Sequence, residues 1–240
     1  MNSESLPPEL LDEFRNMSTC VVADAIETFD VRLRNAGFAS SAIRCMFPNR
    51  SPLVGYAVTT KIRTADPPME GHTYYARPDW WRHIQTIPEP RIIVAQDEDP
   101  APGAGAFVGE VHANILLALG CAGVVTNAAV RDLPAVQASG FQMFAGNVSV
   151  SHAYAHVFDF GGTVELGGLT ISPGDLIQGD LHGVQTIPRE IAAPVASAAR
   201  EVLRKRKILI ELCDSADFTI AKLYETLQRM ESNSTQFPNK

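Results

Sequence analysis

The chain has 240 residues, of which 45% are hydrophobic and 20% are charged, and its formal net charge is −7. This is enough apolar sequence to bury the core of one sizeable domain. The negative balance, with no long run of Lys or Arg, excludes a phosphate backbone as a favoured partner, so we expect no nucleic acid to bind.

The cysteines and the hydropathy pattern argue against export and against a membrane span. The four cysteines lie far apart without CxxC spacing, which indicates reduced thiols. Residues 1–14 are polar and acidic, unlike a signal peptide. The most apolar stretch, residues 115–125, is about half the length needed to cross a bilayer. We therefore expect a cytoplasmic protein without a membrane segment.

In chain order, the sequence first predicts helices and then strands. Apolar residues recur at helical spacing near the N-terminus, where Ser18 or Thr19 can cap the second helix. An alternating segment follows, which is typical of a strand, and a second strand-like segment comes after it. The predicted helices contain residues 10–14 and 21–26, and the predicted strands are 56–64 and 91–96.

The remaining sequence predicts a strand–loop–helix–strand unit, a β-rich layer and two closing helices. The sequence contains no internal repeat or clear linker, so we expect a single domain over residues 1–240, a mixed α/β fold. The expected segments are a glycine-rich loop at 97–109, a helix at 110–119, a strand at 123–126, β segments over 142–186, and helices at 189–204 and 215–230; the core is expected at about 10–193 and a helical extension at about 194–232.

The residues most able to carry chemistry lie at two ends of this unit. A helix starting at Glu110 would point unpaired N–H groups and a partial positive charge at an anion. One helix and one strand later, a crossover returns the chain beside that loop with Arg131 and Asp132. Spacing alone favours a plainer interpretation, in which Asp132 is a helix N-cap, Arg131 a surface residue and Glu110 an acid that complements the helix dipole.

The same stretch resembles the signature of the 4-hydroxy-4-methyl-2-oxoglutarate aldolase and RraA-like family. That signature is an acidic residue, here Glu110, then twenty residues, then the pair Arg131 and Asp132. The likeness extends over about residues 10–193, including the glycine-rich segment 161–169. It implies an RraA-like αββα sandwich similar to the swivelling phosphohistidine-type domain, with extra C-terminal helices.

The resemblance also implies a site. Asp132 would help to hold Mg²⁺ or Mn²⁺, Glu110 would bind the cation through water, and Arg131 would face the substrate. Hard oxygen ligands that retain waters suit Mg²⁺. The carboxylate of the substrate would lie against backbone N–H groups near Gly109, Val111 and His112.

The implied activity is cleavage of 4-hydroxy-4-methyl-2-oxoglutarate-like 2-oxo acids to pyruvate, with oxaloacetate decarboxylation as a second reaction. Both reactions pass through an enolate, whose oxygen is stabilised by a Lewis acid and by a fixed cation. The expected partners are the 2-oxo acid and further copies of the chain in a homotrimer or hexamer. A neighbouring subunit is expected to complete the site, with Glu201 and Glu211 as candidates.

Three features depart from the family pattern or stand apart from it. Asn127 and Ala128 replace the usual Asp-Gly, which removes a charge and makes a glycine turn harder. Trp80 and Trp81 could form a lid, a subunit contact or part of the core. A final pair, His152 and His156, has zinc-helix spacing but lacks a third ligand, so His182 is the better functional candidate, with a structural role favoured even there.

Two other functions compete with the lyase. The first is a non-catalytic RraA-like regulator that binds a protein partner such as a ribonuclease; such members can lack the aspartate of the Arg-Asp pair, so Asp132 favours catalysis. The second is a methyltransferase, supported only by the loop at 103–105. No acidic residue follows a second strand at the distance that a ribose would require, so it is the weakest of the three.

Overall fold

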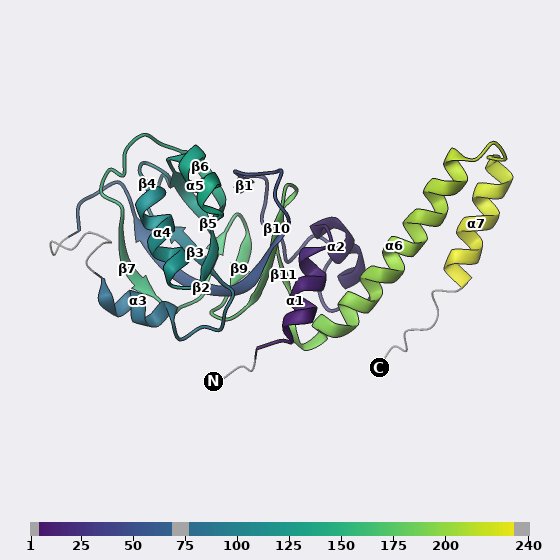
Figure 1. The fold of residues 1–240 in the computed structure, drawn as a ribbon, viewed down its shortest axis with the longest axis horizontal. Helices are drawn as coiled ribbons and strands as arrows, with labels where there is room; N and C mark the ends of the chain where they lie inside the picture. The colour runs from purple at the N-terminus through teal and green to yellow at the C-terminus, as the bar shows by residue number, and fades with distance from the viewer. Residues whose placement is uncertain (1–4, 69–76, 233–240) are drawn as a thin grey trace.

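A large mixed sheet forms the centre of the structure, a computed structural model that describes residues 5–68 and 77–232 (Figure 1). Its strands are β1 (Arg44–Cys45), β2 (Leu53–Arg63), β3 (Arg91–Asp97), β4 (Ala106–Val108), β5 (Cys121–Val130), β6 (Gln142–Val148), β7 (His156–Phe160), β10 (Leu176–Asp180) and β11 (Gly183–Ile187). The order is β1-β6-β5-β3-β2-β10-β11, with β4 beside β5 and β7 beside β2. A separate pair is formed by β8 (Val164–Leu166) and β9 (Leu169–Ile171).

The described part of the chain also contains seven α-helices and a 3₁₀ turn at Arg189–Ile191. Ser18 caps the second helix, as predicted, by accepting a hydrogen bond from the N–H of Val21 at 3.3 Å. The helices are α1 (Pro8–Arg15), α2 (Thr19–Glu27), α3 (Pro78–Ile84), α4 (Glu110–Ala118), α5 (Leu133–Ser139), α6 (Ala192–Asp214) and α7 (Ile220–Ser232).

Parallel strands joined by helical crossovers make up the middle of the sheet. β2, β3, β5 and β6 pair in parallel, and α3, α4 and α5 lie in the connections between them. β10 and β11 extend the sheet in antiparallel fashion, as does β7. The predicted mixed α/β fold, with β segments over residues 142–186, is therefore confirmed.

The core divides between the two faces of this sheet because side chains of a strand alternate in direction. In β3, Ile93 and Ala95 pack with Trp80 of α3 and Leu116 of α4. Ile92 and Val94, on the other face, pack with the β8–β9 pair and with residues of β10 and β11. A third apolar cluster joins α1, α2 and the start of α6 to β2, β10 and β11.

The buried carboxylate of Asp180 fixes the start of α2 to the sheet. It accepts hydrogen bonds from the N–H of Thr19 at 2.9 Å and from its hydroxyl at 2.7 Å. Gln178, also in β10, donates to the carbonyl oxygens of Phe14 and Met17, both at 2.9 Å. These bonds satisfy buried backbone groups in the turn between α1 and α2.

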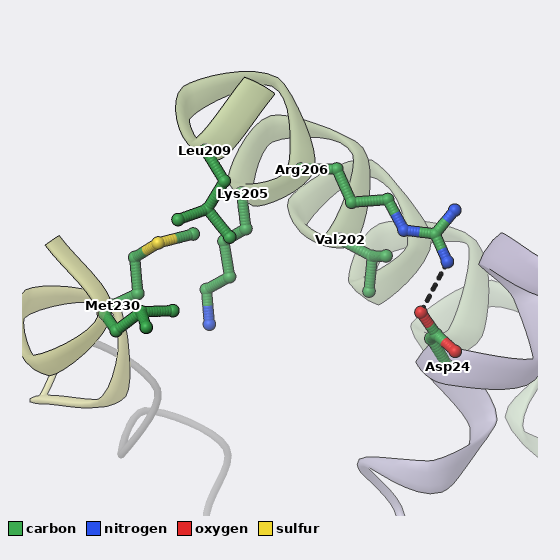
Figure 2. A pocket seen from close by; sticks show the side chains of 7 residues that line it. Asp24, Val202, Lys205, Arg206, Leu209 and Met230 are labelled. Carbon is green, nitrogen blue, oxygen red and sulfur yellow. Dashed lines mark hydrogen bonds and ion pairs between the residues drawn. The ribbon is translucent and has the colours of Figure 1, made fainter. Parts of the chain in front are cut away.

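The C-terminal helices extend away from the sheet (Figure 1). α6 ends at Asp214, ten residues beyond the end of the predicted helix at 204, because most of residues 205–214 are good helix formers. A groove of about 260 Å³ lies between α6, α7 and α2, and Arg206 pairs with Asp24 there at 2.6 Å. Figure 2 shows the side chains that line this groove. In the described residues, no helix has the length and apolar character to cross a membrane.

Replacing Asp180 with alanine is expected to lower the free energy of unfolding by about 2–4 kcal/mol at pH 7, because the buried donors of Thr19 lose their acceptor. Burial raises the pKa of Asp180, but hydrogen bonds from Thr19 and His182 outweigh burial and lower the pKa overall. A lowered pKa adds stability above the unfolded value, about 3.9, that is lost as the pH falls through the folded value.

Urea unfolding of both proteins between pH 7 and pH 3 tests this, and the difference between them should shrink toward acid pH. Asp217→Ala serves as the control, since the Asp217 side chain is 84% exposed. A difference that stays constant with pH would show that the Asp180 carboxylate does not stabilise the turn through its charge.

Candidate functional site

Two strand ends bring the predicted site residues together. β4 and β5 are parallel neighbours, and Val108 is paired with Val130. The residues that follow each strand therefore leave the same edge of the sheet side by side. The N–H of Arg131 donates to the carbonyl of Val108 at 2.9 Å, which ties the second connection to the first.

Gly109 allows the two connections to touch. A Cβ atom on Gly109 would lie 2.5 Å from Oδ2 of Asp132 and 2.9 Å from Cγ of Arg131, both closer than real Cβ contacts. Oδ2 of Asp132 accepts a hydrogen bond from the N–H of Glu110 at 3.1 Å. The Asp132 carboxylate thus lies at the N-terminus of α4, where the partial positive charge of a helix favours an anion.

The backbone of Asp132 has an uncommon, left-handed conformation. Its φ is 55° and its ψ is 38°, a left-handed conformation that is uncommon outside glycine. It occupies the N-cap position of α5, yet its side chain makes no capping hydrogen bond there. The sequence-based N-cap interpretation is therefore right in position and wrong in chemistry, because the carboxylate turns toward α4 instead.

The Asp132 carboxylate is held in its charged form. The hydrogen bond from the Glu110 N–H lowers its pKa most, and the neighbouring Arg131 guanidinium lowers it further. Nε of Arg131 lies 3.2 Å from Oδ1 of Asp132, and the side chains are 32% and 35% exposed. An ionised carboxylate and a guanidinium therefore lie together, both within reach of solvent.

The first turn of α4 presents backbone donors rather than the ring of His112. The first hydrogen bond within the helix runs from the N–H of Ala113 to Gly109, so the N–H groups of Val111 and His112 precede it. The side chains of Glu110 and Val111 are exposed, whereas His112 is 1% exposed. Only the backbone of His112 can belong to an anion cradle.

The buried ring of His112 packs against two aromatic side chains behind the first turn of α4. Its Nδ1 lies 3.1 Å from the carbonyl oxygen of Phe107, and it makes edge contacts with Phe107 and Trp80 at centroid distances of 5.0 and 5.8 Å. Burial lowers the pKa of His112 to about 4, so the ring is neutral at physiological pH. Trp80 is fully buried and Trp81 packs on the same cluster, which confirms core packing for both; residues 74–76 of the aromatic segment lie outside the described part.

An open pocket of about 400 Å³ lies against the Arg-Asp pair. One wall of the pocket, formed by the end of β6 and the residues that follow, was not predicted from the sequence. The adjacency of β5 and β6 in a βαβ unit is the feature from which this wall could have been predicted. The pocket is lined by Val130, Arg131, Asp132, Leu133, Val148, Ser149 and Val150.

The donor set near the pair suits a hard cation that keeps most of its water. Glu110 and Asp132 offer carboxylate oxygens, and Asp132 is ionised. In residues 5–68 and 77–232, no three His, Cys, Asp or Glu side chains are grouped as a metal would require. Mg²⁺ is commonly bound by one or two carboxylates together with waters and substrate oxygens, so these residues fit it.

Asn127 has a structural role. Its side chain accepts from the N–H of Asp97 at 2.7 Å and donates to the carbonyl of Asp97 at 2.9 Å, which joins β5 to β3. Ala128 is buried within β5 and is not among the described residues with positive φ. The alanine therefore meets no conformation that would require glycine.

The three histidines considered as functional candidates lie in different parts of the fold. His152 is in the loop after β6 and His156 begins β7, so the i, i+4 spacing forms no helix. Nδ1 of His152 lies 2.6 Å from the carbonyl of Ala106, just before the Gly109 turn. His182 lies in the turn between β10 and β11, where it contacts Asp180 at 3.2 Å, and it does not line the pocket.

Comparison with known proteins identifies the family. The family model described as RraA-like, Aldolase/RraA, matches residues 19–185, so the chain belongs to the RraA-like family. A protein of Halalkalibacterium halodurans, named as a candidate 4-hydroxy-4-methyl-2-oxoglutarate aldolase, is 26% identical over 182 residues, which cover 75% of this chain and 77% of that protein.

Solved structures share the fold. An uncharacterized protein from Pseudomonas syringae pv. tomato has a TM-score of 0.72 at 22% identity, over 94% of this chain and 97% of that chain. RraAS2 of Streptomyces coelicolor, described as an unusual member of the RNase ES inhibitor RraA protein family, has a TM-score of 0.68 at 17% identity, over 85% and 97% of the two chains. The predicted RraA-like fold with C-terminal helices is thereby confirmed.

A Gly109→Ala substitution is expected to lower the free energy of unfolding by about 1–3 kcal/mol, because the new methyl group overlaps the Asp132 carboxylate. The backbone conformation of Gly109, with φ −130°, suits alanine, so the clash is the sole source of the loss. Urea unfolding measures the change. Gly162→Ala is the matched control, since a Cβ there meets no atom within 4 Å. Equal stability of the two variants would show that the turn at Gly109 has room to spare.

Proposed function

We propose that the protein is a divalent-metal-dependent carbon–carbon lyase. It would release pyruvate from 2-oxo acids of the 4-hydroxy-4-methyl-2-oxoglutarate type and would also decarboxylate oxaloacetate. The observation that carries the proposal is the hydrogen bond from the Glu110 N–H to an ionised Asp132 that lies beside Arg131. The name of the Halalkalibacterium halodurans relative supports the same reaction class.

The reaction breaks the C3–C4 bond of the substrate. Its electron pair moves to C3 and delocalises onto the C2 oxygen, while the C4 hydroxyl loses its proton and becomes a carbonyl. Protonation of C3 then yields pyruvate. In oxaloacetate the departing group is CO₂, and the same enolate remains, so one site serves both reactions.

Arg131 supplies fixed positive charge to the enolate oxygen as it develops. Its guanidinium is oriented by Asp132, and such preorganised charge lowers the barrier because it interacts more strongly with the transition state than with the substrate. The N–H groups of Val111 and His112, at the start of α4, bind the substrate carboxylate. Glu110, exposed on the same turn, is the carboxylate available to relay the C4 hydroxyl proton through water.

Asp132, together with Glu110 through water, would hold Mg²⁺ or Mn²⁺. When bound, the cation would supply Lewis-acid polarisation of the C2 oxygen. We further propose the homotrimer or hexamer implied by the family resemblance. Glu201 and Glu211 lie on α6 and pair with Arg204 and Lys207 in the described chain, so either would have to change partner to enter the site of a neighbouring subunit.

Asp132→Ala is expected to lower kcat/KM for pyruvate release by roughly 100-fold or more, the loss typical of removing one electrostatic group from a site. Asp132→Asn keeps an oxygen acceptor for the Glu110 N–H but removes the negative charge. This variant should therefore fold normally and fail to release pyruvate. Pyruvate is measured with 4-hydroxy-4-methyl-2-oxoglutarate and with oxaloacetate, with Mg²⁺ or Mn²⁺ and with excess chelator.

Asp12→Ala, on the exposed face of α1, is the control and should match the wild type. Release that resists chelator, or that survives in the Asp132→Asn protein, would contradict the proposed site. Absence of release by protein shown to be folded by circular dichroism would favour the regulator alternative over catalysis.

A further inference from the structure

The wall of the pocket beyond the Arg-Asp pair is apolar. Val148 is 51% exposed and Val150 is 94% exposed, although both lie beside a site built from charged groups. Leu133, which also lines the pocket, is partly buried, and Ser149 adds an uncharged hydroxyl. Apolar side chains left open to solvent beside polar groups are typical of ligand contacts.

The loop that carries this wall is fixed in place. Val148 is paired with Val130 in the sheet, and the N–H of Ser149 donates to the Val130 carbonyl at 3.1 Å. Further on, the carbonyl of Ser151 accepts from the N–H of Ala106 at 2.8 Å, next to the contact between His152 and the Ala106 carbonyl. The wall is therefore preformed, and its chemistry can act on substrate selection.

Among the described residues, the lining of the pocket offers no second fixed cation to a substrate that carries two carboxylates. Arg131 is the one cationic residue among the seven that line the pocket in the described part of the chain. Its guanidinium already neighbours Asp132, and the proposed reaction requires it at the C2 oxygen. A second carboxylate on the substrate would meet Val148 and Val150 without a counter-charge among the residues that line the pocket.

We infer that the preferred substrate is a mono-anionic 4-hydroxy-2-oxo acid whose C4 substituent is an alkyl or other uncharged group. This inference rests on the proposed function, since it assumes that the 2-oxo acid head lies at Arg131 and Asp132. The alkyl group lies against Val148, Val150 and Leu133. Dicarboxylates such as 4-hydroxy-4-methyl-2-oxoglutarate are cleaved less efficiently.

A pair of substrates of nearly equal shape tests the selectivity. 4-Hydroxy-5-methyl-2-oxohexanoate carries an isopropyl group at C4, and 4-hydroxy-2-oxoglutarate carries a carboxylate in the same place. We expect kcat/KM to favour the isopropyl compound by about 10-fold or more, the discrimination that a few apolar contacts provide. Val148→Lys adds a cation to the wall and should reverse the preference by a similar factor. Val31→Lys, at another half-exposed valine that does not line the pocket, should leave the ratio unchanged.

A binding measurement separates this inference from the lyase proposal. Calorimetry with 5-methyl-2-oxohexanoate and 2-oxoglutarate, which lack the C4 hydroxyl and cannot be cleaved, should show the same preference and the same reversal by Val148→Lys. If both hydroxy acids are cleaved but the dicarboxylate is preferred or equal, the inference is wrong and the lyase proposal stands. If neither is cleaved while the binding preference holds, the selectivity of the pocket stands and the lyase proposal fails.

Gel filtration excludes one more explanation of the exposed valines. If Val148→Lys changes the oligomeric state and leaves both substrate ratios as in the wild type, the wall is a contact between copies of the chain, and the inference is overturned.

Discussion

The close approach of two loops at Gly109 is the constraint on which the candidate site depends. Without a side chain at that position, the Asp132 carboxylate reaches the N-terminus of α4 and hydrogen-bonds to Glu110. The contact accounts for the left-handed backbone of Asp132, which must turn away from its own helix. It also accounts for the lowered pKa of Asp132 and for the position of Arg131 beside it. A strained residue maintained by its surroundings is often part of a functional site.

A buried neutral ring separates this charged edge from the core. His112 directly follows the exposed Val111, yet its ring packs against Phe107 and Trp80 and forms a hydrogen bond with the Phe107 carbonyl. Since burial keeps the ring uncharged, it adds no cation that could compete with Arg131 for an anion. The positive charge of the site therefore comes from one guanidinium, from helix N–H groups and from whatever cation the carboxylates hold. That division of roles makes the chemistry of the pocket wall decisive for the choice of substrate.

Much of the fold could be predicted from the sequence, because hydrophobic periodicity and glycine position determine elements locally. The strand predicted at residues 91–96, which is β3, and the Ser18 cap of α2 are examples of predictions that the structure confirms. The closeness of Gly109 and Asp132 could be predicted only because a crossover of one helix and one strand returns the chain beside its first loop, since the two residues are far apart in sequence. The direction of the Asp132 side chain could not be predicted from the sequence, because it depends on the absence of a Cβ atom at Gly109 that would otherwise clash with it. The sequence did not indicate that Val148 and Val150 line the pocket, because a valine side chain has no reactive group and its role depends on its neighbours in the sheet.

Family membership alone does not decide between catalysis and regulation, since the RraA-like family includes aldolases as well as non-catalytic regulators. Solved structures at 17–22% identity share the fold, and the fold by itself does not assign a function. The distinction must lie in side chains that a regulator has no need to keep in a strained arrangement. A regulator requires no ionised carboxylate beside a guanidinium at a helix N-terminus, nor an open pocket against that pair. α6 and α7 extend away from the sheet (Figure 1), and the groove that they form with Asp24 of α2 shares no lining residue with the pocket at Arg131 and Asp132.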